Sequence, residues 1–157
     1  MKLKARYFNL EGEPINPTRL EQGTDFVAEV TIENTGRSGT YEQVALTHIF
    51  ASGWEIHNAR LDPSEHRQDS GFDYQDIRDD RIYTYFSIKQ GESKTFRALL
   101  NSSYLGKFYL PMITVEAMYD ASINARVPGQ WCMVVNPGAE TADNQASEKP
   151  GKNKGEF

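Results

Sequence analysis

The densest group of charged side chains lies in the segment "YQDIRDDRIYTYF", Tyr74 to Phe86. Five of them fall within six residues: Asp76, Arg78, Asp79, Asp80 and Arg81. Carboxylates packed this closely could form a catalytic acid–base pair, bind a metal ion or pair with the arginines in a turn. Each of these three kinds of site requires a particular spacing of residues, and the spacing in this segment can be compared with it.

Catalysis and metal binding both fit this segment poorly. Glycoside hydrolysis needs two carboxylates facing each other across a sugar, one of them with a raised pKa. On an extended chain Asp79 and Asp80 point to opposite faces, and the neighbouring arginines lower carboxylate pKa values. A calcium loop needs a central glycine, which "DIRDDR" lacks. We therefore expect a salt-bridged turn that sets the direction of the following strand. In it Arg78 or Arg81 would bond to a carboxylate, with Asp79 or Asp80 as the expected partner, or to a loop carbonyl.

The histidines and the single cysteine give no local catalytic pattern. His48, His57 and His66 are not spaced as metal ligands relative to one another or to Cys132. Cys132 lies between Trp131 and Met133 in an apolar run, where a cysteine behaves as a small hydrophobic residue. We expect no bound metal, no cofactor and no enzymatic activity.

The elements that position these residues are predicted to be β-strands. "DFVAEVTIE" alternates apolar and polar residues with a period of two, and further apolar or alternating runs follow along the chain. About eight strands are predicted, at residues 3–10, 25–33, 44–50, 54–61, 81–88, 93–100, 112–119 and 131–135. Turn signals such as "NTGRSG", "KQGES" and "SYLGK" separate them, which favours an all-β antiparallel sandwich. Only "PTRLEQG" and residues 63–76 are read as possible helical turns.

Composition sets the broad class and the domain limits. The chain has 157 residues, which is enough for one domain. Its net charge of −5 gives no sign of the basic surface that nucleic-acid binding needs. Residues 137–157 lose their hydrophobic side chains and are predicted to form a flexible tail after a domain at 1–136. The start "MKLKARYFNLEGEP" has no apolar stretch of the kind a secretion signal carries. The protein is then either cytoplasmic or a piece of a longer exported chain.

The order of several motifs resembles bacterial alpha-2-macroglobulins. "SGWEI", "IRDDR" and "EAMYDASINARVPG" follow one another as in the C-terminal macroglobulin-like domain of that family, and the resemblance covers about residues 3–136. It implies an immunoglobulin-like antiparallel β-sandwich within a large protease trap of the periplasm or cell envelope, often lipid-anchored. The implied partners are the thioester domain and the other macroglobulin-like domains of the parent protein, and target proteases through the parent.

The resemblance also separates what this chain carries from what its parent would carry. The thioester motif of the family is Cys-x-Glu-Gln, whereas this chain has "RLEQ" at residues 19–22, with arginine in place of the cysteine. In the family, the C-terminal domain shields the thioester of a neighbouring domain from water. Met118 and Tyr119 in "EAMYD" are the candidates for that contact, although strand alternation would also allow either to fill the core.

Two other functions remain open at this stage. The first is a stand-alone adhesion or carbohydrate-binding module that uses Tyr83 and Tyr85, which would share one strand face. The second is a small hydrolase that uses the aspartate cluster.

Overall fold

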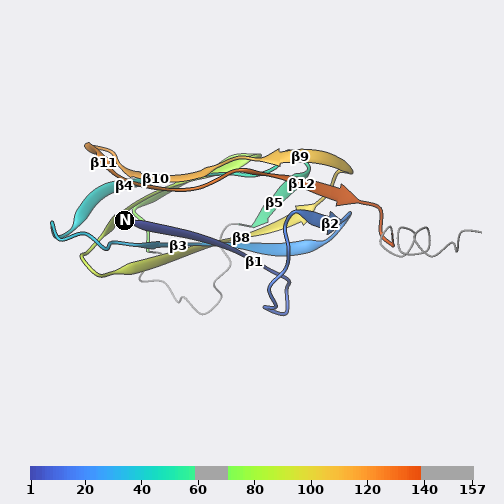
Figure 1. Cartoon of the computed structure of the whole chain (residues 1–157), viewed down its shortest axis with the longest axis horizontal. Coiled ribbons are helices and arrows are strands. Elements are labelled where there is room, and N and C mark those ends of the chain that lie inside the picture. The colour runs from blue at the N-terminus through green and yellow to red at the C-terminus, as the bar shows by residue number, and fades with distance from the viewer. Residues whose placement is uncertain (59–70, 139–157) are drawn as a thin grey trace, which may run out of the picture.

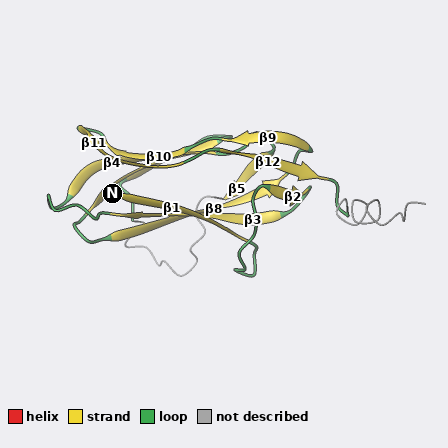
Figure 2. Ribbon diagram, viewed as in Figure 1, coloured by secondary structure: helices red, strands yellow, loops and turns green. Residues whose placement is uncertain are grey.

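The computed structural model describes residues 1–58 and 71–138, and these residues form twelve strands and no helix (Figures 1 and 2). The strands are β1 (Lys2–Phe8), β2 (Arg19–Glu21), β3 (Asp25–Glu33), β4 (Tyr41–Ile49), β5 (Trp54–Asn58), β6 (Tyr74–Ile77), β7 (Arg81–Ile88), β8 (Ser93–Ser102), β9 (Gly106–Leu110), β10 (Ile113–Ala117), β11 (Asp120–Val127) and β12 (Gln130–Val135). No helix that could cross a membrane occurs in the described ranges.

The strands form two layers, which lie one above the other in Figure 1. One layer is a four-stranded sheet in the order β1-β3-β8-β5. The other layer contains a five-stranded sheet, β11-β10-β4-β7-β6, and a three-stranded sheet, β2-β12-β9. All pairs are antiparallel except β12 with β2, which is parallel.

A long ribbon joins the two sheets of the second layer. β9 leads into β10 through Pro111 and Met112, and β11 leads into β12 through Pro128 and Gly129. The β10–β11 hairpin therefore lies at one end of this layer, and the β9–β12 pair lies toward the other (Figure 1). Proline at these two junctions suits a break in pairing, because it has no backbone N–H to donate.

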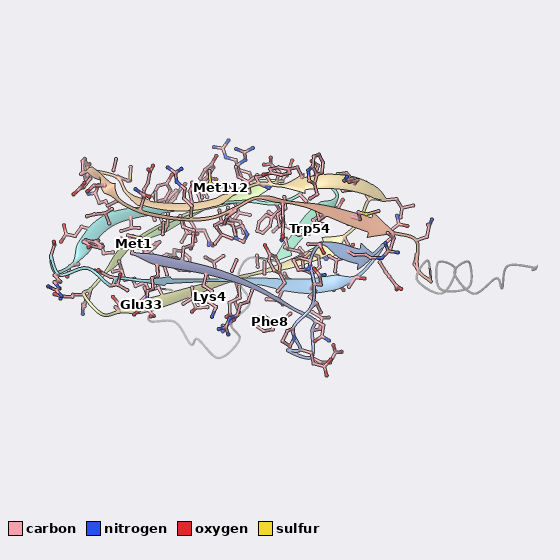
Figure 3. All side chains as sticks on the ribbon, viewed as in Figure 1. Met1, Lys4, Phe8, Glu33, Trp54 and Met112 are labelled. Atoms are coloured by element: carbon pink, nitrogen blue, oxygen red, sulfur yellow. The ribbon has the colours of Figure 1, made fainter. Side chains whose placement is uncertain are left out.

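The core between the layers is apolar and has two parts. Around Trp54, which Figure 3 labels, the side chains between the first layer and the β9–β12 region pack together. This part consists of Leu20, Phe26, Ala28, Phe50, Ala51, Trp54, Ile82, Ala98, Leu100, Leu110, Cys132 and Val134. The part under the five-stranded sheet consists of Val30, Ile32, Val44, Leu46, Phe86, Ile88, Ile113 and Val115. The predicted alternation of β3 is confirmed, because Phe26, Ala28, Val30 and Ile32 are all buried.

Asn34 joins two loops at one end of the sandwich. Its side chain is fully buried, and its Nδ2 donates to the carbonyl oxygens of Gly39 and Ile88 at 2.9 and 3.2 Å. Its Oδ1 accepts the backbone N–H of Gly36 at 3.0 Å, and its own carbonyl accepts that of Gly91 at 2.9 Å. The β3–β4 loop and the β7–β8 turn are thus held by one side chain and its backbone.

The prediction of an all-β sandwich is confirmed, but several details of it are wrong. The described residues hold twelve strands rather than about eight, because β2, β6, β9 and β11 are additional. Residues 19–21 form a strand and not a helical turn, and β10 ends at Ala117, before Met118 and Tyr119. The first predicted strand ends at Phe8. Residues 59–61 of another predicted strand, most of segment 63–76 and residues 139–157 of the predicted tail lie outside the described residues.

Candidate functional site

The hairpin between β10 and β11 ends in a two-residue turn formed by Met118 and Tyr119. The strands close at the pair Ala117 and Asp120, so the chain reverses direction within these two residues. Their side chains are 55% and 84% exposed. Large apolar side chains are usually buried in a folded protein. Two adjacent exposed ones at a turn therefore form an apolar tip.

The backbone of β4 holds this tip. The N–H of Met118 donates to the carbonyl oxygen of Gln43 at 3.0 Å, which continues the β4–β10 ladder by one step. Gln43 has a φ of 52° and is the one non-glycine residue with positive φ in the described parts of the chain. It lies where the β4–β7 register shifts between Tyr41 and Val44. A β-bulge at this position lets β4 adopt a conformation that L-residues rarely take.

Asp120 fixes the other side of the tip. Its Oδ1 accepts hydrogen bonds from the Ser122 hydroxyl and from the Ser122 backbone N–H. These two bonds lower the pKa of the Asp120 carboxyl, the bond from the hydroxyl being the larger cause. The turn is therefore ordered by local polar contacts, while its two apolar side chains point to the outside.

The charged segment forms the connection between β6 and β7. Arg78 Nε lies 3.1 Å from Asp76 Oδ2, and Arg81 forms two bonds to Asp80, at 2.9 and 2.8 Å. Both pairs are local to the hairpin and substantially exposed. The hydrogen bond from Arg81 lowers the pKa of Asp80, which keeps this carboxylate ionised and unsuited to a general-acid role. The hairpin is joined to β4 through the backbone, where the Phe50 N–H donates to the Asp80 carbonyl at 2.9 Å.

The two tyrosines of β7 lie on the outer face of the five-stranded sheet. Tyr83 already contacts two arginines: Arg81 donates to its hydroxyl, and the Arg78 guanidinium lies 6.0 Å from its ring centre. Tyr85 lies beside Tyr74 of β6, with ring centres 5.9 Å apart and planes inclined by 31°. Tyr83 and Tyr85 share this face of β7, and the aromatic pair on it is formed by Tyr74 and Tyr85.

The histidines and the cysteine have different surroundings. His48 is buried against the ring of Phe50, and burial lowers its pKa to about 3. Cys132 is also buried, and burial raises its pKa, which opposes formation of a thiolate. His66 lies outside the described residues. Within the described ranges, no three His, Cys, Asp or Glu side chains are grouped as metal ligands.

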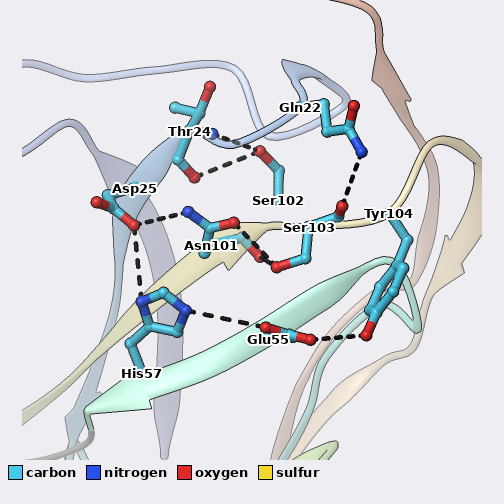
Figure 4. A network of polar contacts seen from close by, with 9 residues as sticks. All are labelled: Gln22, Thr24, Asp25, Glu55, His57, Asn101, Ser102, Ser103 and Tyr104. Atoms are coloured by element: carbon cyan, nitrogen blue, oxygen red, sulfur yellow. Dashed lines mark hydrogen bonds and ion pairs between the residues drawn. The ribbon is translucent and has the colours of Figure 1, made fainter.

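A surface network that the sequence analysis missed crosses β3, β8 and β5 (Figure 4). Asn101 donates to Asp25 at 2.8 Å, and the Tyr104 hydroxyl donates to Glu55 at 2.8 Å. His57 lies between the two carboxylates, 3.7 Å from Asp25 and 3.9 Å from Glu55. The sequence could have indicated that these polar residues point outward from their strands. It could not have indicated that they lie close together, because that depends on the strand register.

Comparison with known proteins identifies the family. A model of the "Bacterial Alpha-2-macroglobulin MG10 domain" family matches residues 1–121. The alpha-2-macroglobulin of Pasteurella multocida is 23% identical over 125 residues, which cover 80% of this chain and 6% of that protein. An alpha-2-macroglobulin homolog of Yersinia pestis is 23% identical over 159 residues, covering 87% of this chain and 8% of that protein. The chain thus spans less than a tenth of the length of these curated relatives.

Solved structures show the same fold. A Salmonella alpha-2-macroglobulin matches with a TM-score of 0.74 at 18% identity, covering 87% of this chain and 9% of that chain. An Escherichia coli alpha-2-macroglobulin fragment that extends to the C-terminus matches with a TM-score of 0.74 at 14% identity, covering 86% of this chain and 23% of that one. The predicted immunoglobulin-like sandwich is therefore confirmed. From the family match over residues 1–121, this chain belongs to the bacterial alpha-2-macroglobulin MG10 domain family.

Proposed function

We propose that this chain is the non-catalytic C-terminal domain of a larger alpha-2-macroglobulin-like protease inhibitor of the bacterial cell envelope. In this role Met118 and Tyr119 pack against the thioester domain of the parent and keep water from its thioester. The parent, and not this domain, would meet the target proteases. The family match and the small fraction of each relative that the chain spans support a role within a multidomain protein.

The observation that carries the proposal is the apolar tip of the β10–β11 hairpin. Met118 and Tyr119 are consecutive, and both are exposed because they form the turn itself. Had they continued the strand, they would point to opposite faces, and one would enter the core. The bond from Met118 to Gln43 and the bonds from Ser122 to Asp120 hold the turn in one shape before any contact forms. A preformed apolar tip suits the exclusion of water from an activated acyl group.

The test uses the full-length parent with Met118→Ala and Tyr119→Ala, singly and together. The thiol released by spontaneous hydrolysis is measured over time with a thiol reagent, in buffer without protease. We expect faster release in each single variant and the fastest release in the double variant, because water then reaches the thioester. Leu10→Ala serves as the matched control, since Leu10 is a similarly exposed apolar residue on a different loop.

Two results would contradict the proposal in distinguishable ways. A double variant that hydrolyses at the same rate as the wild type would show that the tip does not shield the thioester. A wild-type parent that releases no thiol after treatment with methylamine would show that it has no thioester to shield.

A further inference from the structure

A second surface feature, separate from the apolar tip, is a cleft of about 660 Å³ beside the edge strand β5. Its walls come from the end of β4 and the β4–β5 loop, from β5, from the β6–β7 turn, and from the segment that leads into β9 and past its end. Figure 4 shows one wall, where Tyr104 lies over Glu55. The volume is within the range of sites that hold a side chain or a small ligand.

The charge of the cleft has one sign. Glu55, Asp79 and Asp80 line it, and no lysine, arginine or histidine of the described residues does. Asp80 is already paired with Arg81, whereas Asp79 makes no ion pair or hydrogen bond to another side chain in the described part of the chain. Glu55 accepts a neutral donor, the Tyr104 hydroxyl, and the pKa of Tyr104 is raised because of this bond. Apart from His57, whose Nε2 lies 3.9 Å from Glu55, these two carboxylates have no basic partner among the described residues, and a cation entering the cleft would be attracted.

A buried polar atom points to a ligand of a more specific kind. Trp54 lines the same cleft and is only 3% exposed. Its indole Nε1–H has no hydrogen-bond partner among the described residues. A buried donor without an acceptor is costly, and a carbonyl oxygen of a bound chain is a suitable acceptor.

The rim of the cleft continues into an exposed aromatic patch. Tyr109 lines the cleft and contacts Trp131 of β12 edge to face, with ring centres 5.3 Å apart. These side chains are 50% and 59% exposed, and Met133 beside them is also exposed. Lys107 Nζ lies 5.0 Å from the centre of the Trp131 ring, so a cation lies against the patch, whereas the cleft is lined by anions. Tyrosine, tryptophan and methionine are the residues enriched in protein–protein interfaces.

From these observations we propose that the β5–β9 cleft and the adjoining Trp131 patch bind a polypeptide segment that carries an arginine or lysine next to an apolar residue. The basic side chain enters the cleft between Glu55 and Asp79, and the apolar side chain packs on Tyr109 and Trp131. Lys107 repels the basic side chain from the Trp131 end and so fixes the direction of the segment. A backbone carbonyl of the segment accepts the hydrogen bond of Trp54.

Other ligands fit this surface less well. Sugar rings stack on flat aromatic faces, but Tyr109 and Trp131 are inclined by 72° and one face of Trp131 is near Lys107. A divalent cation would need three or more ligands in one group, and the described residues contain no such group. This inference does not depend on the thioester-shielding role of Met118 and Tyr119.

The test follows the two tryptophan side chains by NMR, since the chain has only two. The ¹⁵N-labelled 157-residue chain is titrated with the capped peptide acetyl-Gly-Arg-Leu-Gly-amide, and Trp131→Phe assigns the two indole N–H signals. Both indole signals should shift and saturate with the arginine peptide. Its citrulline counterpart, which has nearly the same shape without the charge, should bind about two- to fivefold more weakly, the range that one exposed ion pair contributes. Raising the salt concentration should also weaken binding of the arginine peptide.

Matched variants separate the cleft from general charge effects. Glu55→Gln with Asp79→Asn should weaken binding of the arginine peptide by about two- to fivefold for each ion pair that is lost. Glu42→Gln with Glu116→Gln removes the same net charge at exposed positions outside the cleft and should leave binding unchanged. Equal affinity for the arginine and citrulline peptides, or an unshifted Trp54 signal at saturation, would overturn the proposal. So would indole shifts that follow protein concentration without peptide, because the surface would then be occupied by a second copy of the chain.

Discussion

Lowering the pH should destabilise this domain through His48. The side chain of His48 is 6% exposed, its Nε2 has no hydrogen-bond partner among the described residues, and Gln75 Oε1 nearby is likewise unsatisfied. Burial lowers the pKa of His48 from 6.5 to about 3. The unfolded chain therefore takes up a proton on this histidine between pH 6.5 and pH 3, while the folded chain does not, so stability is retained above pH 6.5 and lost as the pH falls.

The size of the effect follows from the two pKa values. Each pH unit between 6.5 and 3 changes the free energy of unfolding by up to about 1.4 kcal/mol. From pH 7 to pH 5 the loss is about 2 kcal/mol, and from pH 7 to pH 4 it is about 3 kcal/mol. The groups near His48 from the neighbouring elements include Gln75 of β6 and Arg97 of β8, whose guanidinium is bonded to Glu29. Neither alters the direction of the effect, because Gln75 is neutral and a nearby cation would also disfavour a protonated histidine.

The assay is denaturant unfolding at pH 7, 6, 5 and 4 for the wild type and for His48→Gln. The variant keeps a polar side chain but cannot titrate, and all surface carboxylates contribute equally to both proteins. The difference between the two free energies of unfolding should change with pH by the amounts above. Parallel curves for the two proteins, or an NMR titration of His48 with a midpoint near 6.5, would refute the reasoning.

Three further outcomes follow from buried contacts. Asn34→Ala should lower the free energy of unfolding by about 2–3 kcal/mol, because three hydrogen bonds of a fully buried side chain are lost, and urea denaturation would measure it; a loss below about 0.5 kcal/mol would contradict this. Gly53→Ala should also destabilise, by about 1–3 kcal/mol, because a Cβ at this position lies 2.3 Å from the ring of Phe108; Gly53→Ala combined with Phe108→Leu should recover part of the loss in a thermal melt. Cys132 should react with a thiol reagent only as fast as the domain unfolds, because it is buried and its pKa is raised. Rapid labelling of the folded protein would contradict the burial of Cys132.

The sequence predicted the strands whose apolar periodicity is strong and missed those that depend on pairing. β3 alternates along its whole length, so its buried face could be recognised without a partner. β11, "DASINARV", carries Asp, Ser and Asn, residues that disfavour strands, and is extended because it pairs with β10. β2 has only three residues and is held by parallel pairing to β12. Such strands are set by tertiary contacts, which local patterns do not contain.

The candidate sites show the same division. Met118 and Tyr119 could be selected from the sequence, but their joint exposure required knowing that β10 ends at Ala117. The pairing of Arg78 and Arg81 with aspartates is local, and adjacent opposite charges indicated it. Glu55 and Asp79 line the same cleft although they are more than twenty residues apart in the sequence, and this depends on how β5 and the β6–β7 turn are placed. No pattern within one segment could have indicated it.

The ribbon that carries β9 into β10 has a further consequence for how many contacts the domain can make at once. Tyr109 and Met118 are nine residues apart on this nearly extended ribbon, which corresponds to roughly 25–30 Å. This distance leaves room for a short segment bound at Tyr109 while a second partner contacts Met118, so the proposed contacts would make the domain a bivalent connector. Attachment at both ends would raise the effective concentration of each partner for the other.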